Sequence, residues 1–292
     1  MPVSRVLTVG QFSESPVLVA ADHLGLLTDA GLEIRRERVP SSPDQFGSLA
    51  RGDLDLVITS PDNVLLYGTT SANPLGVRLD LRMERAIDRG LGLALVTRPG
   101  IATPADLRTR VLAVDVTRSG FALLLFRMLD HLGVDRSSVE IRELGSTPRR
   151  ATALIDGEID GTILNAESRV RALRAGMTAW VSSADLYPNY LGTVLAAPAG
   201  ADRDPIDRLL EVWDRATTWL RDAAASDVRA ALARQGEDLG SAEYLDLLRT
   251  PSFGLVADPV VDVADLQVLA AIRRDSGAYA PDDGALAGLV TP

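Results

Sequence analysis

A sixteen-residue pattern that occurs twice constrains the fold of this chain more than any other feature. The first copy, SLARGDLDLVITSPDN, covers residues 48–63, and the second, ALIDGEIDGTILNAES, covers residues 153–168. Self-similarity at one fixed, long offset predicts two structurally equivalent halves. Four positions are identical between the copies: Leu49 and Leu154, Gly52 and Gly157, Asp55 and Asp160, and Ile58 and Ile163.

Each copy predicts the same succession of local structures. An apolar helix ends at Gly52 or Gly157, where a left-handed C-terminal cap costs glycine little. The short apolar runs that follow, residues 54–59 and 159–164, predict strands buried on both faces of a parallel sheet. Polar turns come directly after these strands, at the edge where open α/β sheets bind ligands. The turns are Ser60 to Asn63 and Asn165 to Ser168.

The rest of the chain predicts a β-α-β-α-β order in each half, so the expected fold class is α/β with two doubly wound, mostly parallel sheets. Lobe one is expected to comprise residues 1–95 plus 191–292, and its last part is mostly helical. Lobe two, residues 96–190, is inserted between them. Apolar segments at about 90–98 and 189–197 are expected to be the two hinge strands that cross between the lobes.

Composition excludes several kinds of chemistry. A net charge of −10 argues against a nucleic-acid or anionic-membrane partner. The chain contains neither cysteine nor lysine, which excludes thiol nucleophiles, thiolate metal sites and a lysine Schiff base. No histidine or acidic motif indicates a metal site, so neither a metal nor a cofactor is expected.

Five segments, spread over nearly the whole chain, carry a resemblance to a known family. They are residues 17–31 (VLVAADHLGLLTDAG), 49–63, 103–107 (TPADL), 119–121 (SGF) and 154–165. In order and spacing these segments resemble the type II solute-binding proteins of ABC transporters, in the branch that binds aliphatic sulfonates and thiamine precursors. The resemblance implies a two-lobed clamshell of the type II periplasmic-binding-protein fold. It also implies closure on a small organic molecule that is usually anionic or heteroaromatic.

Candidate ligand-binding residues follow from the strand ends and from the resemblance. Residues that follow strands or match the family's ligand-contacting loops are expected at the cleft. Arg118 offers a guanidinium that binds carboxylate or sulfonate in a bidentate fork, and is favoured over the pair Arg149 and Arg150. Aromatic residues near loop ends can stack on a ligand ring. The full set is Gln11, Phe12, Ser13, Ser60, Asp62, Asn63, Arg118, Ser119, Gly120, Phe121, Asn165, Tyr187 and Tyr190.

Several of these residues also have an ordinary structural role. Ser60 and Ser119 stand directly before helical segments, where a serine hydroxyl caps the first turn, and both roles are compatible. For Phe12, Phe121 and Tyr187, core packing is the alternative.

Two classes of function stay open on sequence. The first is a small-molecule-binding protein that captures a sulfonate, carboxylate or pyrimidine ligand in the cleft between the lobes. The second is a cytosolic enzyme of lyase, decarboxylase or isomerase type, because the family fold also resembles cytosolic enzymes. Its acid and base would be carboxylates at strand ends. These candidates are Glu14, Asp62, Asp115 and Glu167.

The place of action and the partners depend on export. The N-terminal segment MPVSRVLTVG enters a predicted strand at once and carries no export signal, so the sequence as written predicts a cytoplasmic protein. An ABC transporter is the expected partner if the protein is exported, and a cytosolic sensor or pathway chaperone is a weaker third alternative. The ligand's identity and the oligomeric state do not follow from the sequence.

Overall fold

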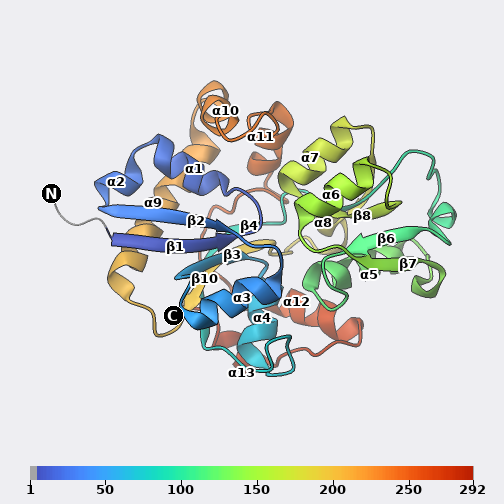
Figure 1. The fold of residues 1–292 in the computed structure, drawn as a ribbon, viewed down its shortest axis with the longest axis horizontal. Coiled ribbons are helices and arrows are strands. Elements are labelled where there is room, and N and C mark those ends of the chain that lie inside the picture. Colours follow the sequence, from blue (N-terminus) through green and yellow to red (C-terminus); the bar gives the residue numbers. More distant parts are fainter. Residues whose placement is uncertain (1–4, 292) are drawn as a thin grey trace.

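The computed structural model describes residues 5–291 and shows two α/β lobes, each built on one five-stranded sheet (Figure 1). In lobe one the strand order is β2-β1-β3-β10-β4, with β1, β2 and β3 parallel and β10 antiparallel to both of its neighbours. The strands are β1 (Arg5–Gln11), β2 (Leu32–Arg38), β3 (Leu56–Thr59), β4 (Leu81–Asp88) and β10 (Thr193–Pro198).

Lobe two repeats this topology. Its strand order is β7-β6-β8-β5-β9, with β6, β7 and β8 parallel and β5 antiparallel to both of its neighbours. One reversed strand therefore stands at the equivalent place in each sheet, and the predicted two-lobed α/β fold is confirmed. The strands are β5 (Ala94–Thr97), β6 (Val111–Val114), β7 (Glu140–Glu143), β8 (Gly161–Leu164) and β9 (Thr178–Ser182).

Helices cover both sheets, and a C-terminal group follows β10 (Figure 1). In lobe one they are α1 (Pro16–His23), α2 (Leu26–Asp29), α3 (Ser42–Arg51) and α4 (Pro61–Thr69). In lobe two they are α5 (Gly120–His131), α6 (Thr147–Ile155), α7 (Ala166–Arg174) and α8 (Ser183–Leu186). The C-terminal group is α9 (Arg203–Asp222), α10 (Ala225–Ala233), α11 (Ala242–Arg249), α12 (Val263–Asp275) and α13 (Asp283–Ala287).

The duplicated pattern adopts the same structure in both lobes. Gly52 and Gly157 both have φ of +78°, which confirms the predicted left-handed turn after each helix. The identical aspartates also do the same work, because Asp55 accepts the N–H of Thr8 at 2.7 Å and Asp160 accepts that of Val111 at 2.8 Å. Each aspartate thereby ties the turn before one strand to the adjacent strand.

The two crossings between the lobes are shorter strands than the sequence predicts. The first predicted strand is regular only over β5, because Gly90, Leu91 and Gly92 have φ of 103°, 48° and 71° and bend the chain before it. The second becomes regular at β10. A Cβ atom on Gly192 would lie 2.3 Å from the backbone nitrogen of Gly90, so the crossings meet backbone to backbone. Their action as a hinge stays a prediction.

The C-terminal helices contact both lobes rather than the first alone. Helices α9 and α10 pack on α1 of lobe one, as expected, but α11 packs on α7 of lobe two. Helix α12 lies at the junction and contacts α4 of lobe one and α5 of lobe two (Figure 1). This helix therefore bridges the two lobes.

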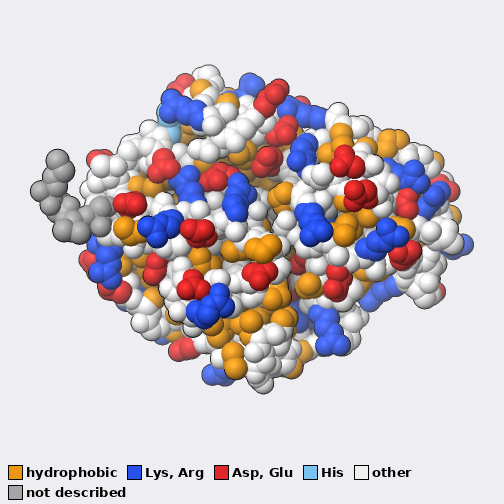
Figure 2. All heavy atoms as spheres, viewed as in Figure 1, with side chains coloured by type: hydrophobic (Ala, Val, Ile, Leu, Met, Phe, Trp, Pro, Cys, Tyr) orange, Lys and Arg blue, Asp and Glu red, His pale blue; other side chains and the backbone are white. Residues whose placement is uncertain are grey.

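One apolar core extends across the junction. It contains Val57 and Leu65 from lobe one, Leu124 from lobe two and Leu269 from α12, all at most 2% exposed. Figure 2 shows acidic and basic side chains interspersed over the visible face, with hydrophobic side chains gathered where the lobes meet. The lobes are therefore packed against each other in this structure.

The sequence prediction omitted strand β4. This strand contains four charged residues among eight, which hides its apolar pattern, yet most of it is buried. Its charges are paired by distant segments: Glu84 accepts Arg203 at 2.7 Å and Arg85 pairs with Asp214 at 3.0 Å, both partners lying on α9. A helix more than 100 positions later therefore pairs two of the four charges of this strand.

Candidate functional site

Three adjoining cavities form a trench between the lobes. The hinge-side cavity, of about 120 Å³, lies against the two crossings, and the central cavity measures about 60 Å³. The outer cavity, of about 720 Å³, lies beside α12. Neighbouring cavities share wall residues, so we treat the trench as one candidate site with three compartments. Phe12, Ser60, Phe121 and Thr147 line the first two cavities, and Ser42, Asn63 and Ser119 line the last two.

Six helices begin at the wall of the hinge-side or central cavity, three from each lobe. A helix N-terminus carries unpaired N–H groups and a partial positive charge, and therefore favours anions. Six such termini favour a negatively charged group in this volume, although the carboxylates Glu14, Asp88 and Asp115 line the same two cavities and oppose it. Their N-cap residues are Ser15, Ser41 and Ser60 of α1, α3 and α4, and Ser119, Ser146 and Asn165 of α5, α6 and α7.

The capping alternative for the two predicted serines is confirmed. The hydroxyl oxygen of Ser60 accepts the N–H of Asp62 at 3.3 Å, and that of Ser119 accepts the N–H of Ala122 at 3.1 Å. In contrast, the side chains of Ser146 and Asn165 cap nothing, although both line the trench. Their polar atoms are thus available to a ligand.

Arg150 is a buried cation at the wall of the central cavity. Its side chain is 1% exposed, and no carboxylate among residues 5–291 lies within salt-bridge distance. It donates to Thr162 Oγ1 at 3.1 Å, to Thr147 Oγ1 at 3.1 Å and to the carbonyls of Ile163, at 3.3 Å, and Gly145. Burial lowers the pKa of the guanidinium, and the negative charge of Asp115 opposes this shift.

A buried charge that lacks a directly paired counter-charge is costly, and a bound anion would supply one. Arg150 is therefore the main positive group of the central cavity. Sequence reasoning considered it beside Arg149 but favoured Arg118, because nothing in the pair itself shows which arginine is buried. One signal was available: Arg150 is the counterpart of Gln45 at the same offset that relates Gly157 to Gly52.

The structure brings most of the predicted residues together in the trench. Nine of the thirteen predicted ligand-binding residues line at least one cavity, as do two of the four predicted carboxylates. Contact with a ligand stays a prediction for all of them. The lining residues are Phe12, Ser13, Ser60, Asn63, Arg118, Ser119, Gly120, Phe121 and Asn165, with the carboxylates Glu14 and Asp115.

Asp62 lies behind the cavity wall. Its carboxylate pairs with Arg273 of α12 at 2.6 Å, and both side chains are 2% exposed. Burial raises the pKa of Asp62, while the charge of Arg273 opposes the rise. A Cβ on Gly120 of lobe two would lie 2.4 Å from the Cβ of Asp62, so only glycine fits between them. The pair therefore joins lobe one, lobe two and α12; Asp62 faces no cavity, and Arg273 lines only the outer one.

Three other predicted ligand residues also lie outside the cavity walls. Gln11 is fully buried and donates to Glu14 at 3.4 Å. Tyr187 accepts the Nε–H of Arg127 at 3.4 Å and packs against the shared core. Tyr190 is 1% exposed, and its hydroxyl has no hydrogen-bond partner among the described residues. Both tyrosines belong to the shared apolar core, which for Tyr187 is the packing alternative.

The four candidate carboxylates do not form a facing acid and base pair. Glu14 is held by Arg36 at 3.1 Å and Arg38 at 3.3 Å, and Asp115 accepts the hydroxyl of Ser119. Burial raises the pKa of Glu167, but this residue lines none of the three cavities. With Asp62 engaged by Arg273, the geometry gives the enzyme alternative no support.

Sequence reasoning missed Asp88, at the end of β4. This residue is 1% exposed, lines the hinge-side cavity and accepts the N–H of Gly90 at 2.7 Å. Burial raises its pKa to about 6, which hydrogen bonds from Thr193 and Gly90 partly offset. The signal was lost because the sequence did not predict the strand that carries it.

The architecture is that of a two-lobed solute-binding protein. A family model described as NMT1/THI5 like matches residues 13–223, more than two thirds of the chain. The chain therefore belongs to the NMT1/THI5-like family, as the resemblance in the sequence indicated. No curated protein matches it by sequence.

Solved structures of similar fold cover nearly the whole chain. The alkanesulfonate-binding protein SsuA from Xanthomonas axonopodis pv. citri, bound to MOPS, is 16% identical with a TM-score of 0.76 over 98% of both chains. The periplasmic aliphatic sulphonate binding protein SsuA from Escherichia coli is 18% identical, with a TM-score of 0.73 over 99% of this chain and 92% of that one. The periplasmic nitrate-binding protein NrtA from Synechocystis PCC 6803 is 11% identical, with a TM-score of 0.76 over 99% and 86%.

Two features are absent from residues 5–291. No group of three or more histidine, cysteine, aspartate or glutamate side chains within residues 5–291 could hold a metal ion. In the same residues, no helix has both the length and the apolar character needed to cross a membrane.

Proposed function

We propose that this protein captures a small organic anion in the central and hinge-side cavities, without chemical conversion. One observation carries the proposal: Arg150, a buried guanidinium without a directly paired carboxylate, faces a cavity surrounded by helix N-termini. A sulfonate or carboxylate fits this arrangement, because its oxygens accept from the guanidinium and from free N–H groups.

The volumes of the two cavities narrow the class of ligand further. The central and hinge-side cavities have volumes of about 60 and 120 Å³, well below the usual range for drug-sized ligands. Short-chain sulfonates and carboxylates are therefore favoured over a pyrimidine. The names of the structural neighbours, two sulfonate binders and one nitrate binder, support an anionic ligand.

The partner and the place of action belong to the same proposal. Two of the neighbours are named as periplasmic proteins, which supports export of this chain and delivery of its ligand to an ABC transporter. Cell fractionation of the native organism tests export. Recovery of the protein only from the cytoplasm would contradict it.

The test of the binding site uses titration calorimetry with methanesulfonate, ethanesulfonate, acetate and nitrate. Arg150→Gln replaces the cation by the residue found at the equivalent position of lobe one. We expect it to weaken anion binding by about 30-fold or more, since removal of one partner of a buried charge pair costs about 2 kcal/mol or more.

Arg149→Gln is the matched control, because it removes the same charge from the adjacent, exposed position. It is expected to bind like the unmodified chain. Equal losses of anion affinity in both variants would mean that Arg150 acts only through its charge at long range, and not by direct contact. The absence of any anion binding by the unmodified chain would overturn the proposal.

A further inference from the structure

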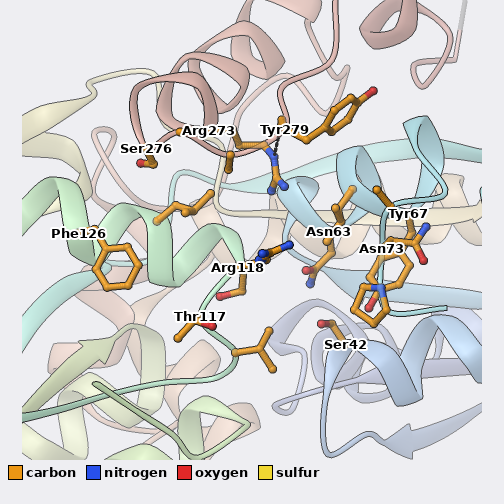
Figure 3. Close-up of a pocket in the computed structure, with 18 of the residues that line it drawn as sticks. Ser42, Asn63, Tyr67, Asn73, Thr117, Arg118, Phe126, Arg273, Ser276 and Tyr279 are labelled. Carbon is orange, nitrogen blue, oxygen red and sulfur yellow. Dashed lines mark hydrogen bonds between the residues drawn. The ribbon is translucent and has the colours of Figure 1, made fainter. Parts of the chain in front are cut away.

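The outer cavity differs from the rest of the trench in size and in its walls. It is about 720 Å³ in volume and lies between α4, the loop before α5, and the end of α12. Figure 3 shows Arg118 reaching from lobe two toward Asn63 of lobe one, with Phe126 to its left and Tyr279 beside Arg273. This volume falls in the usual range of small-molecule sites.

The charges on this wall favour an anion. Three arginines line the cavity and no acidic residue does, although the chain has 40 acidic and 30 basic residues. Arg273 is neutralised by Asp62, and Arg136 by Asp130 at 2.6 Å. Arg118 pairs with no carboxylate among residues 5–291, so it is the one lining cation there without a counter-charge.

Two buried hydroxyls lie at the same wall. Tyr67 is fully buried, and its hydroxyl lies beside Ser42, which also lines the cavity. The hydroxyl of Ser276 is buried and has no hydrogen-bond partner among the described residues. Both hydroxyl oxygens are shielded from solvent, so they shape the wall and are not open to the cavity.

Aromatic side chains complete the wall. Tyr67 stacks on Phe46 with ring centroids 4.2 Å apart, which fixes its ring and therefore its hydroxyl. Phe126 lies under the guanidinium of Arg136, at 5.2 Å, and Tyr279 is 43% exposed. Rings of this kind favour a flat ligand that can pack edge to face or in an offset stack.

We propose that the outer cavity is a second binding site, for a ring-bearing carboxylate. Arg118 binds its carboxylate, and Phe126 and Tyr279 flank its ring. The site does not include Arg150. It goes beyond the capture of a small anion in the central cavity, and either site can fail without the other.

The experiment uses 4-(trifluoromethyl)benzoate as the probe, followed by ¹⁹F NMR line broadening, with methanesulfonate titrated in parallel. Arg118→Gln is expected to weaken probe binding about 10-fold, because it removes a charge-assisted bond to the carboxylate. Tyr67→Phe keeps the ring and removes only a shielded hydroxyl, so it should leave probe binding unchanged. Arg118 is exposed, so Arg118→Gln should not perturb the fold.

Controls separate the two sites. Arg149→Gln should leave probe binding unchanged, and Arg118→Gln should leave methanesulfonate binding unchanged. Arg150→Gln should lose methanesulfonate and keep the probe. Three results would overturn the second site: no probe binding by the unmodified chain, equal binding by Arg118→Gln, or one-for-one displacement of the probe by methanesulfonate.

Discussion

The two lobes place different side chains at one equivalent position, and the difference assigns the cation of the proposed anion site to lobe two. In lobe one, Gln45 donates through its amide nitrogen to the carbonyls of Gly10 and Ile58, each at 3.1 Å. In lobe two, Arg150 donates to the carbonyl of Ile163, the counterpart of Ile58. Both side chains thus support the same strand from the same helix, but only lobe two adds a positive charge.

The N-cap residues of the helices show a similar difference between the lobes. Ser41 and Ser60 of lobe one both accept backbone N–H groups of their own helices. Their counterparts in lobe two, Ser146 and Asn165, do not. Lobe two therefore leaves polar atoms free at the positions where lobe one uses them for its own stability. The comparison implies that lobe two supplies most of the specific contacts to an anion.

The strongest test of this comparison is Gln45→Arg, which gives lobe one the residue of lobe two. Gln45 is fully buried and lines none of the three cavities, so an arginine there would have neither space nor a counter-charge. We expect a loss of about 3 to 5 kcal/mol in the free energy of unfolding, measured by chemical denaturation. Arg150→Gln should cost little or stabilise the ligand-free protein. Equal losses in both variants would show that the lobes are not specialised.

The crossing between the lobes provides the next test, through Asp88. Because its pKa is raised to about 6 from 3.8, the protonated form stabilises the fold at low pH. That contribution is lost as pH rises through about 6. Asp88→Asn imitates the protonated form and should raise the free energy of unfolding at pH 8 by up to about 3 kcal/mol.

The matched measurement for Asp88→Asn is the same denaturation at pH 4, where the two proteins should be equally stable. A constant difference between pH 4 and pH 8 would mean that Asp88 does not titrate in this range. A gain in the free energy of unfolding at pH 8 but not at pH 4 would establish that the ionised carboxylate of Asp88 destabilises the crossing.

The junction of the lobes gives a third test at the first residue of two equivalent helices. Helix α1 begins with Pro16 and α5 with Gly120, each after a serine cap. Only Gly120 has Asp62 of the other lobe against it, where a methyl group does not fit. Gly120→Ala should therefore cost about 1 to 3 kcal/mol. It should also increase the radius of gyration in solution scattering, whereas Pro16→Ala should leave that radius unchanged.

The sequence predicted the features that depend on local pattern. The duplicated turns, the strands before them and the serine caps all follow from residues within a few positions of one another. The pairing of Asp62 with Arg273 could not be predicted, because the partners are 211 positions apart. Strand β4 was missed for the same reason, since α9 pairs two of its charges. The burial of Arg150 depends on how its helix packs. The only sign of this in the sequence is that Arg150 occupies the position equivalent to Gln45.

The smallest expected effects come from two serine-to-alanine variants, which distinguish a helix cap from a ligand contact. Ser41→Ala removes a hydroxyl that accepts the N–H of Asp44 at 3.3 Å, and should cost about 1 kcal/mol of stability. Ser146→Ala removes a hydroxyl that caps nothing, so its stability should change by less than about 0.5 kcal/mol. The order should be reversed for anion affinity. Ser146→Ala should bind the anion several-fold more weakly, since one hydrogen bond contributes about 1 kcal/mol. Calorimetry and denaturation on the same two proteins measure both effects. If Ser146→Ala lost stability and kept its affinity, the free hydroxyl of lobe two would be a cap after all, and the division of work between the lobes would rest on Arg150 alone.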